Sequence, residues 1–151
     1  MTPIRIPREA LILVGDGEKA MFLRNRGDEE YPNLVVERLF EHDNPPTREQ
    51  GTDQPGRVND AFGRKSAVEN TDWHRIEKER FAKELAERLY KSAHAGQFQH
   101  LIVVAPPQVL GNLRNDFHAE VKSRIVAEVD KTLTQHPVYE IERLLTGGRK
   151  K

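Results

Sequence analysis

His100-Leu-Ile-Val-Val-Ala-Pro-Pro107 is the stretch of sequence that decides the fold. The run His100–Ala105 is almost entirely apolar, which is typical of a strand buried on both faces of a sheet. Two prolines end the strand, and Pro107 suits the first position of a helix, where no N–H donor is needed. An earlier run, Ala10–Val14, has the same buried character. Two such strands separated by a helix indicate a right-handed crossover between parallel neighbours in an α/β sheet.

The segment after the first run indicates a meander of three strands. Asp16-Gly17 follows directly, and an Asp-Gly pair between apolar segments is a strong signal for a hairpin turn. A second strand is predicted over Lys19–Arg26, with its side chains alternating between the two faces. A third is predicted over Leu34–Glu41.

The periodic pattern disappears between His42 and Asp72, where prolines and glycines are spread among polar residues. A connection of about thirty residues without periodicity is either functional or disordered. We expect residues from about 44 to 72 to be mobile without a partner, because they bury too little apolar surface to offset the entropy of ordering.

An amphipathic helix is predicted next, capped by Thr71 or Asp72 and stopped by Gly96. Another is predicted from Pro107 to about Ser123, and a last short one over Val138–Leu145.

The intervening segment, from about Ile125 to Thr134, is ambiguous. Apolar residues spaced by four from Leu113 to Leu133 would allow one long helix. The alternation after Ile125 and its β-branched residues favour a strand instead.

These elements predict a mixed five-stranded α/β sheet in the order β-β-β-α-β-α-β-α, with a long irregular loop before the first helix. The order matches ribonuclease H-like folds. Residues 1–148 are predicted to form a single domain, and residues 149–151 a basic tail.

Composition excludes several classes of function. Among 151 residues, 24 Lys and Arg balance 24 Asp and Glu, so net charge gives no reason to expect binding to nucleic acid or membranes. The chain has no cysteine, which removes disulfides, thiolate catalysis and cysteine-ligated metals. Its apolar runs are too short to cross a bilayer, and residues 1–5 lack the features of a secretory signal. We therefore expect a cytoplasmic protein with no membrane partner.

Four segments carry a resemblance to a known family. The sequence Leu101-Ile-Val-Val-Ala-Pro-Pro-Gln-Val-Leu-Gly-Asn-Leu-Arg114 resembles the signature of the bacterial host-attachment protein family. The family's opening hairpin, first helix and C-terminal end are similar to three further segments: Leu11-Ile-Leu-Val-Gly-Asp-Gly-Glu-Lys-Ala20, Glu79-Arg-Phe-Ala-Lys-Glu-Leu-Ala-Glu-Arg-Leu89 and Val126-Ala-Glu-Val-Asp-Lys-Thr-Leu-Thr134.

The resemblance implies a ribonuclease H-like sheet and a role at the ribosome, because that family is regarded as bacterial relatives of the middle domain of archaeal and eukaryotic peptide-chain release factors. In release factors the catalytic Gly-Gly-Gln lies in the loop before the first long helix. The corresponding stretch here, residues 51–72, contains no Gly-Gly-Gln. We therefore expect no peptidyl-tRNA hydrolysis by the release-factor mechanism.

Asp16 is the candidate residue for a cleft at the end of a strand. Ribonuclease H-like nucleases need several carboxylates converging on two metal ions. The partner acid is expected after the fourth strand, where Ala105-Pro106-Pro107 supplies none. The six histidines show no metal-ligand spacing. We therefore expect no catalytic residue, metal or cofactor, and a structural role for Asp16 in the turn.

Arg57, Arg64 and Lys65 are the candidate contacts to RNA phosphates, because they lie in the loop that occupies the release-factor catalytic position. Acidic residues are interleaved with them, so the alternative is a solvated loop. Two functions therefore remain open. The first is a non-catalytic, ribosome- or RNA-associated module of release-factor ancestry. The second is a protein-interaction domain in attachment to host cells, without RNA binding.

Overall fold

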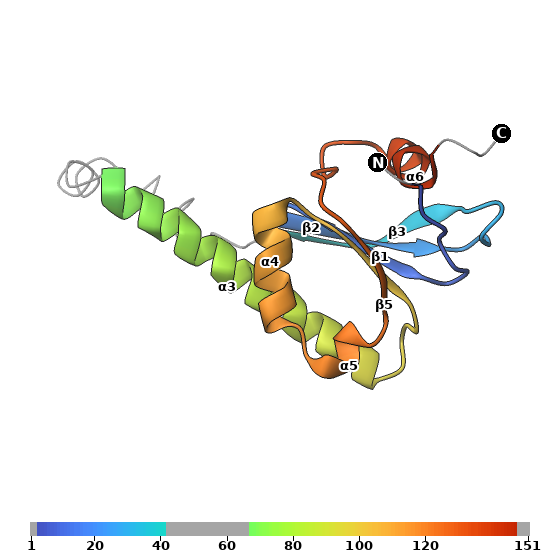
Figure 1. Ribbon diagram of the computed structural model, residues 1–151, viewed down its shortest axis with the longest axis horizontal. Helices are drawn as coiled ribbons and strands as arrows, with labels where there is room; N and C mark the ends of the chain where they lie inside the picture. Colours follow the sequence, from blue (N-terminus) through green and yellow to red (C-terminus); the bar gives the residue numbers. More distant parts are fainter. Residues whose placement is uncertain (1–2, 42–66, 148–151) are drawn as a thin grey trace.

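The computed structural model describes residues 3–41 and 67–147, with side chains from residue 75 onward in the second range. Its strands and helices follow one another in nearly the order that the sequence predicts, except that two helices, α4 and α5, stand where one was expected (Figure 1). They are β1 (Leu11–Gly15), β2 (Lys19–Asn25), β3 (Leu34–Glu41), α3 (Ala67–His94), β4 (Leu101–Val104), α4 (Pro107–Asp116), α5 (Ala119–Lys122), β5 (Ile125–Val129) and α6 (Val138–Thr146).

The five strands form one mixed sheet in the order β3-β2-β1-β4-β5. β1 pairs in parallel with β4, in a register that sets Leu11 against Leu101, and β4 pairs in parallel with β5. The β1–β2 and β2–β3 pairs are antiparallel, which is the predicted meander. The predicted ribonuclease H-like mixed sheet is therefore confirmed.

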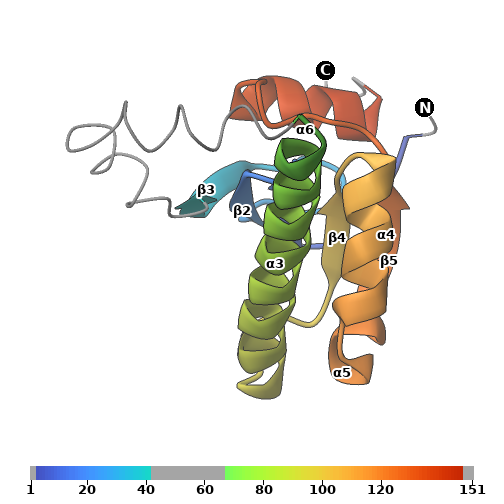
Figure 2. The same cartoon turned by 90° about the vertical axis from the view of Figure 1, so that its left-hand side faces the viewer.

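Each face of the sheet has its own hydrophobic core. α3, α4 and α5 cover one face, and α6 covers part of the other (Figures 1 and 2). Alternation along β1 explains the division, because Leu11 and Leu13 point to the three helices whereas Ile12 and Val14 point to α6. We call these two sides the three-helix face and the α6 face.

The predicted start of the first helix is wrong. α3 begins at Ala67, so residues 67–72, which were expected to be mobile and irregular, are helical. Thr71 and Asp72 lie within the helix and do not cap it, because Ala67-Val-Glu-Asn contains no proline or glycine to stop the helix from extending. The remainder of the expected mobile loop lies outside the described residues.

The single helix predicted from Pro107 to Ser123 is also wrong, because the chain breaks into α4 and α5. Phe117 and His118 both have extended backbone between the two helices. The break lets Phe117 pack in the core of the three-helix face, and the His118 ring accepts a hydrogen bond of 3.0 Å from the Glu120 N–H. A buried aromatic residue and an N-cap together outweigh the continuous helical spacing.

The last predicted strand is too long. β5 ends at Val129, not at Thr134, because the strand it pairs with, β4, ends at Val104 before Ala105 and the two prolines. Thr134 is nevertheless buried, and its hydroxyl donates a hydrogen bond to the carboxylate of Asp16, the residue that follows β1.

A buried asparagine fixes the path of the N-terminal segment. The Asn25 amide is fully buried and donates to the carbonyls of Ile6 at 2.9 Å, Pro7 at 3.2 Å and Asp28 at 3.3 Å. Its Oδ1 accepts the N–H groups of Gly27 and Asn33, each at 2.9 Å. One side chain therefore satisfies backbone groups of the N-terminal segment and of the β2–β3 turn together.

Replacing Asn25 by Ala is expected to lower the free energy of unfolding by about 3 kcal/mol or more, because an unsatisfied buried polar group costs about 1–3 kcal/mol and several are created. Urea denaturation measures the change. Asn112→Ala on α4 is the control, since the Asn112 side chain has no hydrogen-bond partner among the described residues. Equal stability of the two variants would contradict the role given to Asn25.

Candidate functional site

The carboxyl edge of the sheet, where β1 and β4 end side by side, holds Asp16. Its Oδ1 accepts the N–H of Glu18 at 2.9 Å and of Lys19 at 3.0 Å, which closes the β1–β2 turn. Its Oδ2 accepts the Thr134 hydroxyl at 2.7 Å. Asp16 therefore joins the hairpin turn to the segment that follows β5.

The pKa of Asp16 reflects two opposing effects. Partial burial raises the pKa, but the hydrogen bonds from Thr134, Glu18 and Lys19 and the positive charge of Lys19 outweigh it. The pKa therefore lies below its ordinary value of 3.8, and the carboxylate is charged at neutral pH.

The described residues form no metal centre around Asp16. β4 is followed by Ala105 and Pro106, and the described parts of the chain contain no group of three or more His, Asp or Glu side chains able to hold a metal ion. With its oxygens engaged by Thr134 and two backbone N–H groups, Asp16 is placed to hold a turn.

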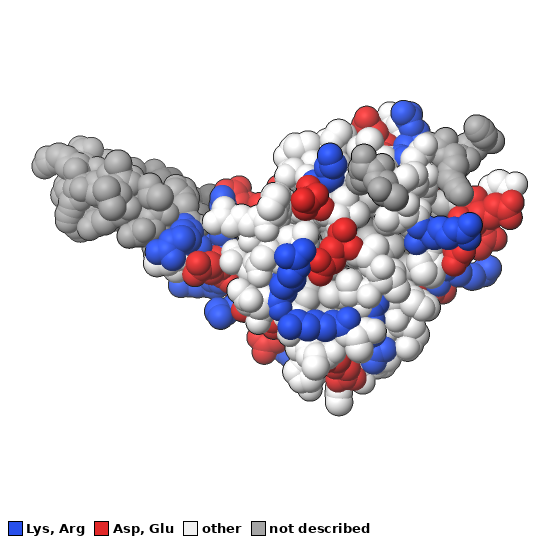
Figure 3. Space-filling model, in the orientation of Figure 1, with Lys and Arg blue, Asp and Glu red and all other residues white. Residues whose placement is uncertain are grey.

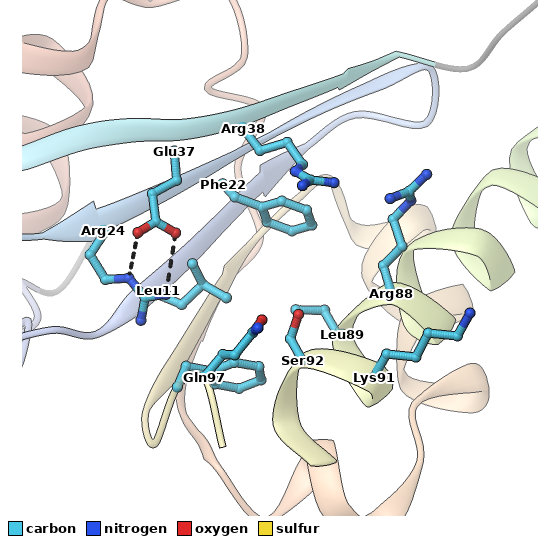
Figure 4. A pocket seen from close by; sticks show the side chains of 11 residues that line it. Leu11, Phe22, Arg24, Glu37, Arg38, Arg88, Leu89, Lys91, Ser92 and Gln97 are labelled. Carbon is cyan, nitrogen blue, oxygen red and sulfur yellow. Dashed lines mark hydrogen bonds and ion pairs between the residues drawn. The ribbon is translucent and has the colours of Figure 1, made fainter. Parts of the chain in front are cut away.

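A pocket of about 360 Å³ lies at a different place, between strands β1–β3 and the C-terminal half of α3 (Figure 4). Its floor is apolar and its rim is polar. The floor is made of Leu11, Phe22, Leu89 and Phe98, and the rim of Arg24, Glu37, Arg38, Arg88, Lys91, Ser92 and Gln97.

Basic side chains outnumber acidic ones around this pocket. Arg24 binds Glu37 through two hydrogen bonds of 3.0 and 3.2 Å, which neutralises the carboxylate of the rim. Arg38 and Lys91 form no ion pair with any described residue. Figure 4 shows Arg38 and Arg88 directed toward one another across the opening, whereas Lys91 points away from the cavity.

Aromatic stacking positions Arg88. Its guanidinium lies 4.2 Å from the centre of the Phe40 ring, and Phe40 stacks on Phe81 with ring centres 5.5 Å apart. A guanidinium stacked on an aromatic face keeps the N–H donors at its edge available to another group. The arrangement is therefore suited to binding an anion.

The sequence-predicted contacts Arg57, Arg64 and Lys65 lie outside the described residues, so the structure does not place them. The pocket was not predicted. Arg38 lies on β3 and Arg88 lies on α3, and only the packing of that helix on the sheet brings them together. Arg38 faces Phe22 only because of the register of β2 and β3, so no local sequence signal indicated the pocket.

Elsewhere the surface is mixed in charge. On the face shown in Figure 3, basic and acidic side chains are interspersed, in keeping with the balanced composition. Within the described ranges, no helix has the length and apolar character needed to cross a membrane.

Residues 9–145 match the sequence profile described as bacterial archaeo-eukaryotic release factor family 12. The chain belongs to this family. The relationship to release factors expected from the sequence is thereby confirmed, whereas a role in host attachment stays a prediction.

Other similarities are more distant. A stretch of 70 residues is 31% identical to the uncharacterized protein RP470 of Rickettsia prowazekii (strain Madrid E), covering 45% of this chain and 47% of that protein. The archaeal translation termination factor aRF1 is similar in structure, with a TM-score of 0.45 and 15% identity over 79% of this chain and 29% of its own. A second archaeal protein has a TM-score of 0.46 and 14% identity over 93% and 34% of the two chains. The chain thus spans about half the length of its curated relative and about a third of these solved chains.

Thr134→Val is expected to raise the pKa of Asp16. The substitution removes the Thr134 hydrogen bond, which lowers this pKa, and leaves the burial that raises it. The folded-state pKa of Asp16 lies below its unfolded value of 3.8, so its stabilising contribution is complete above 3.8 and is lost as pH falls through the folded pKa. The variant is expected to be less stable by about 1 kcal/mol at neutral pH, since water partly replaces the lost hydrogen bond. The difference from wild type should shrink as pH falls below 3.8.

Carboxyl NMR titration and urea unfolding at pH 7 and pH 3 measure these two effects. Thr146→Val is the matched control, because that buried hydroxyl donates to the Glu142 carbonyl, which does not titrate. A loss of stability in Thr134→Val that did not change with pH would show that Asp16 gains nothing from this bond.

Proposed function

We propose that the protein is a non-catalytic module of release-factor ancestry that associates with the ribosome or with RNA in the cytoplasm. The observation that carries the proposal is the match to a release-factor family over residues 9–145. The family relationship extends over nearly all of the described fold, so the whole domain, and not a short motif, supports a translation-related partner.

RNA contact through the loop before α3 is part of this proposal. Arg57, Arg64 and Lys65 are the cations of residues 51–72, the stretch that corresponds to the one carrying the release-factor catalytic motif. Lysine and arginine bind phosphates without reading sequence, so such contacts would position the domain on RNA. The folded part of the domain would bind its partner through other residues.

The absence of catalysis is supported by the residues themselves. The sequence contains no Gly-Gly-Gln. Asp16, the acid at the end of β1, is engaged in a turn, and the described structure holds no group of three or more His, Asp or Glu side chains able to bind a metal ion. A module of this kind would occupy a site without cleaving peptidyl-tRNA or RNA.

An exposed apolar patch favours the second candidate, a protein-interaction domain that functions in attachment to host cells. Val36 and Leu39 on the edge strand β3 are 48% and 57% exposed. Both lie on the α6 face, opposite Leu23 and Met21 respectively. Exposed apolar side chains on an edge strand are a common contact surface for another protein.

Sedimentation with ribosomes at two salt concentrations separates the two candidates. RNA association is expected to give co-sedimentation at low salt that weakens steeply as salt rises, because each neutralised phosphate releases about one counterion. Replacing Arg57, Arg64 and Lys65 together by Ala is expected to weaken binding and to flatten the salt dependence by roughly 2–3 units of slope.

The matched control replaces three exposed cations of the described fold, Lys122, Lys131 and Arg143, by Ala. Both triple variants lose the same charge, so a specific loop contact predicts that only the first loses binding. No binding by the wild type at low salt, or equal effects of the two variants, would favour the protein-interaction candidate.

A further inference from the structure

We propose that the pocket between β3 and α3 is a binding site for a phosphate-bearing nucleotide, either free or as one unit of single-stranded RNA. The phosphate would lie between Arg38 and Arg88, and the base would lie over the apolar floor. This inference goes beyond ribosome association, because the pocket would bind a nucleotide whether or not the loop before α3 contacts RNA.

The phosphate position follows from the charges that face the opening. Arg38 and Arg88 reach toward the same space from opposite walls (Figure 4), and neither has an acidic partner among the described residues. Two guanidinium groups directed at one another repel unless an anion lies between them. Glu37 does not fill that role, because Arg24 holds both of its oxygens.

The preference for phosphate follows from the donors. Arginine presents planar pairs of N–H groups that match phosphate oxygens, and stacking on Phe40 holds Arg88 in place before any ligand arrives. Less side-chain entropy is then lost on binding. Arg38 has no such support, so it is free to close on the anion.

The base position follows from the floor. Phe22 on β2 and Leu89 on α3 project into the space between the sheet and the helix (Figure 4), and Phe98 also lines the cavity. A planar base can pack on this apolar surface, and the Ser92 hydroxyl and the Gln97 amide at the rim can hydrogen-bond its edge. The volume of about 360 Å³ is within the range of about 300–1,000 Å³ found for small-molecule pockets. An inorganic anion alone would leave the apolar floor unused.

Titration of the full chain with adenosine monophosphate, inorganic phosphate and adenosine, followed by amide NMR, tests the site. Adenosine monophosphate is expected to bind more tightly than phosphate or adenosine, and to shift signals of Phe22, Arg38, Ser92 and Gln97. Arg38→Ala combined with Arg88→Ala is expected to weaken that binding by about tenfold or more, since each hydrogen bond to a charged group contributes about that factor.

Lys122→Ala combined with Arg143→Ala removes the same charge outside the pocket and is expected to leave binding unchanged. Arg38→Gln alone provides a second test that keeps Arg88 on Phe40, so it does not disturb the aromatic stack. A four-nucleotide single-stranded RNA is the last probe. Tighter binding than adenosine monophosphate assigns RNA as the ligand, and binding no tighter assigns a free nucleotide.

Three results would overturn the proposal. One is adenosine monophosphate binding no more tightly than inorganic phosphate, which would show that the floor is not used. Another is equal binding by the wild type and by both Arg38 variants. The third is the same loss of binding in the Lys122 and Arg143 control, which would indicate a general effect of net charge.

Discussion

Parallel pairing between β1 and β4 is the constraint on which the rest of the structure depends. Both strands are buried on both faces, so each must be covered by helices or loops above and below. The connection from the meander to β4 therefore includes a helix that packs on the sheet, and the connection from β4 to β5 does the same. α3, α4 and α5 consequently lie on one face, and α6 is the helix left for the other.

Uneven coverage by these helices gives the molecule its two distinctive surfaces. β3 is the strand farthest from β4, and most of its side chains are exposed. A β-bulge makes Glu37 an extra residue in β3, because Arg38 lies opposite Phe22 while Val36 lies opposite the next residue, Leu23. Opposed residues share a face, so the bulge leaves Val36 and Leu39 on the α6 face and Arg38 on the three-helix face. The apolar patch and the basic pocket thus lie on opposite sides of one strand.

Sequence predicted the features that depend on local chemistry. The buried runs gave β1 and β4, the Asp-Gly turn gave the hairpin, and the β-branched residues after Ile125 indicated β5 correctly. Boundaries that depend on tertiary contacts were missed. The α4–α5 break requires the burial of Phe117, and the end of β5 depends on where its neighbour β4 stops. The pocket could not be predicted, because Arg38 and Arg88 come from elements whose packing no local pattern specifies.

Directed hydroxyl-radical probing of ribosomal RNA is the sharpest test of whether this domain contacts RNA at the pocket between β3 and α3. The chain has no cysteine, so Lys91→Cys at the pocket rim and Tyr139→Cys on α6 each provide a single attachment point for an iron chelate. RNA contact at the pocket predicts local RNA cleavage from position 91 and little from position 139. Absence of cleavage from position 91, or equal cleavage from both positions, would contradict it.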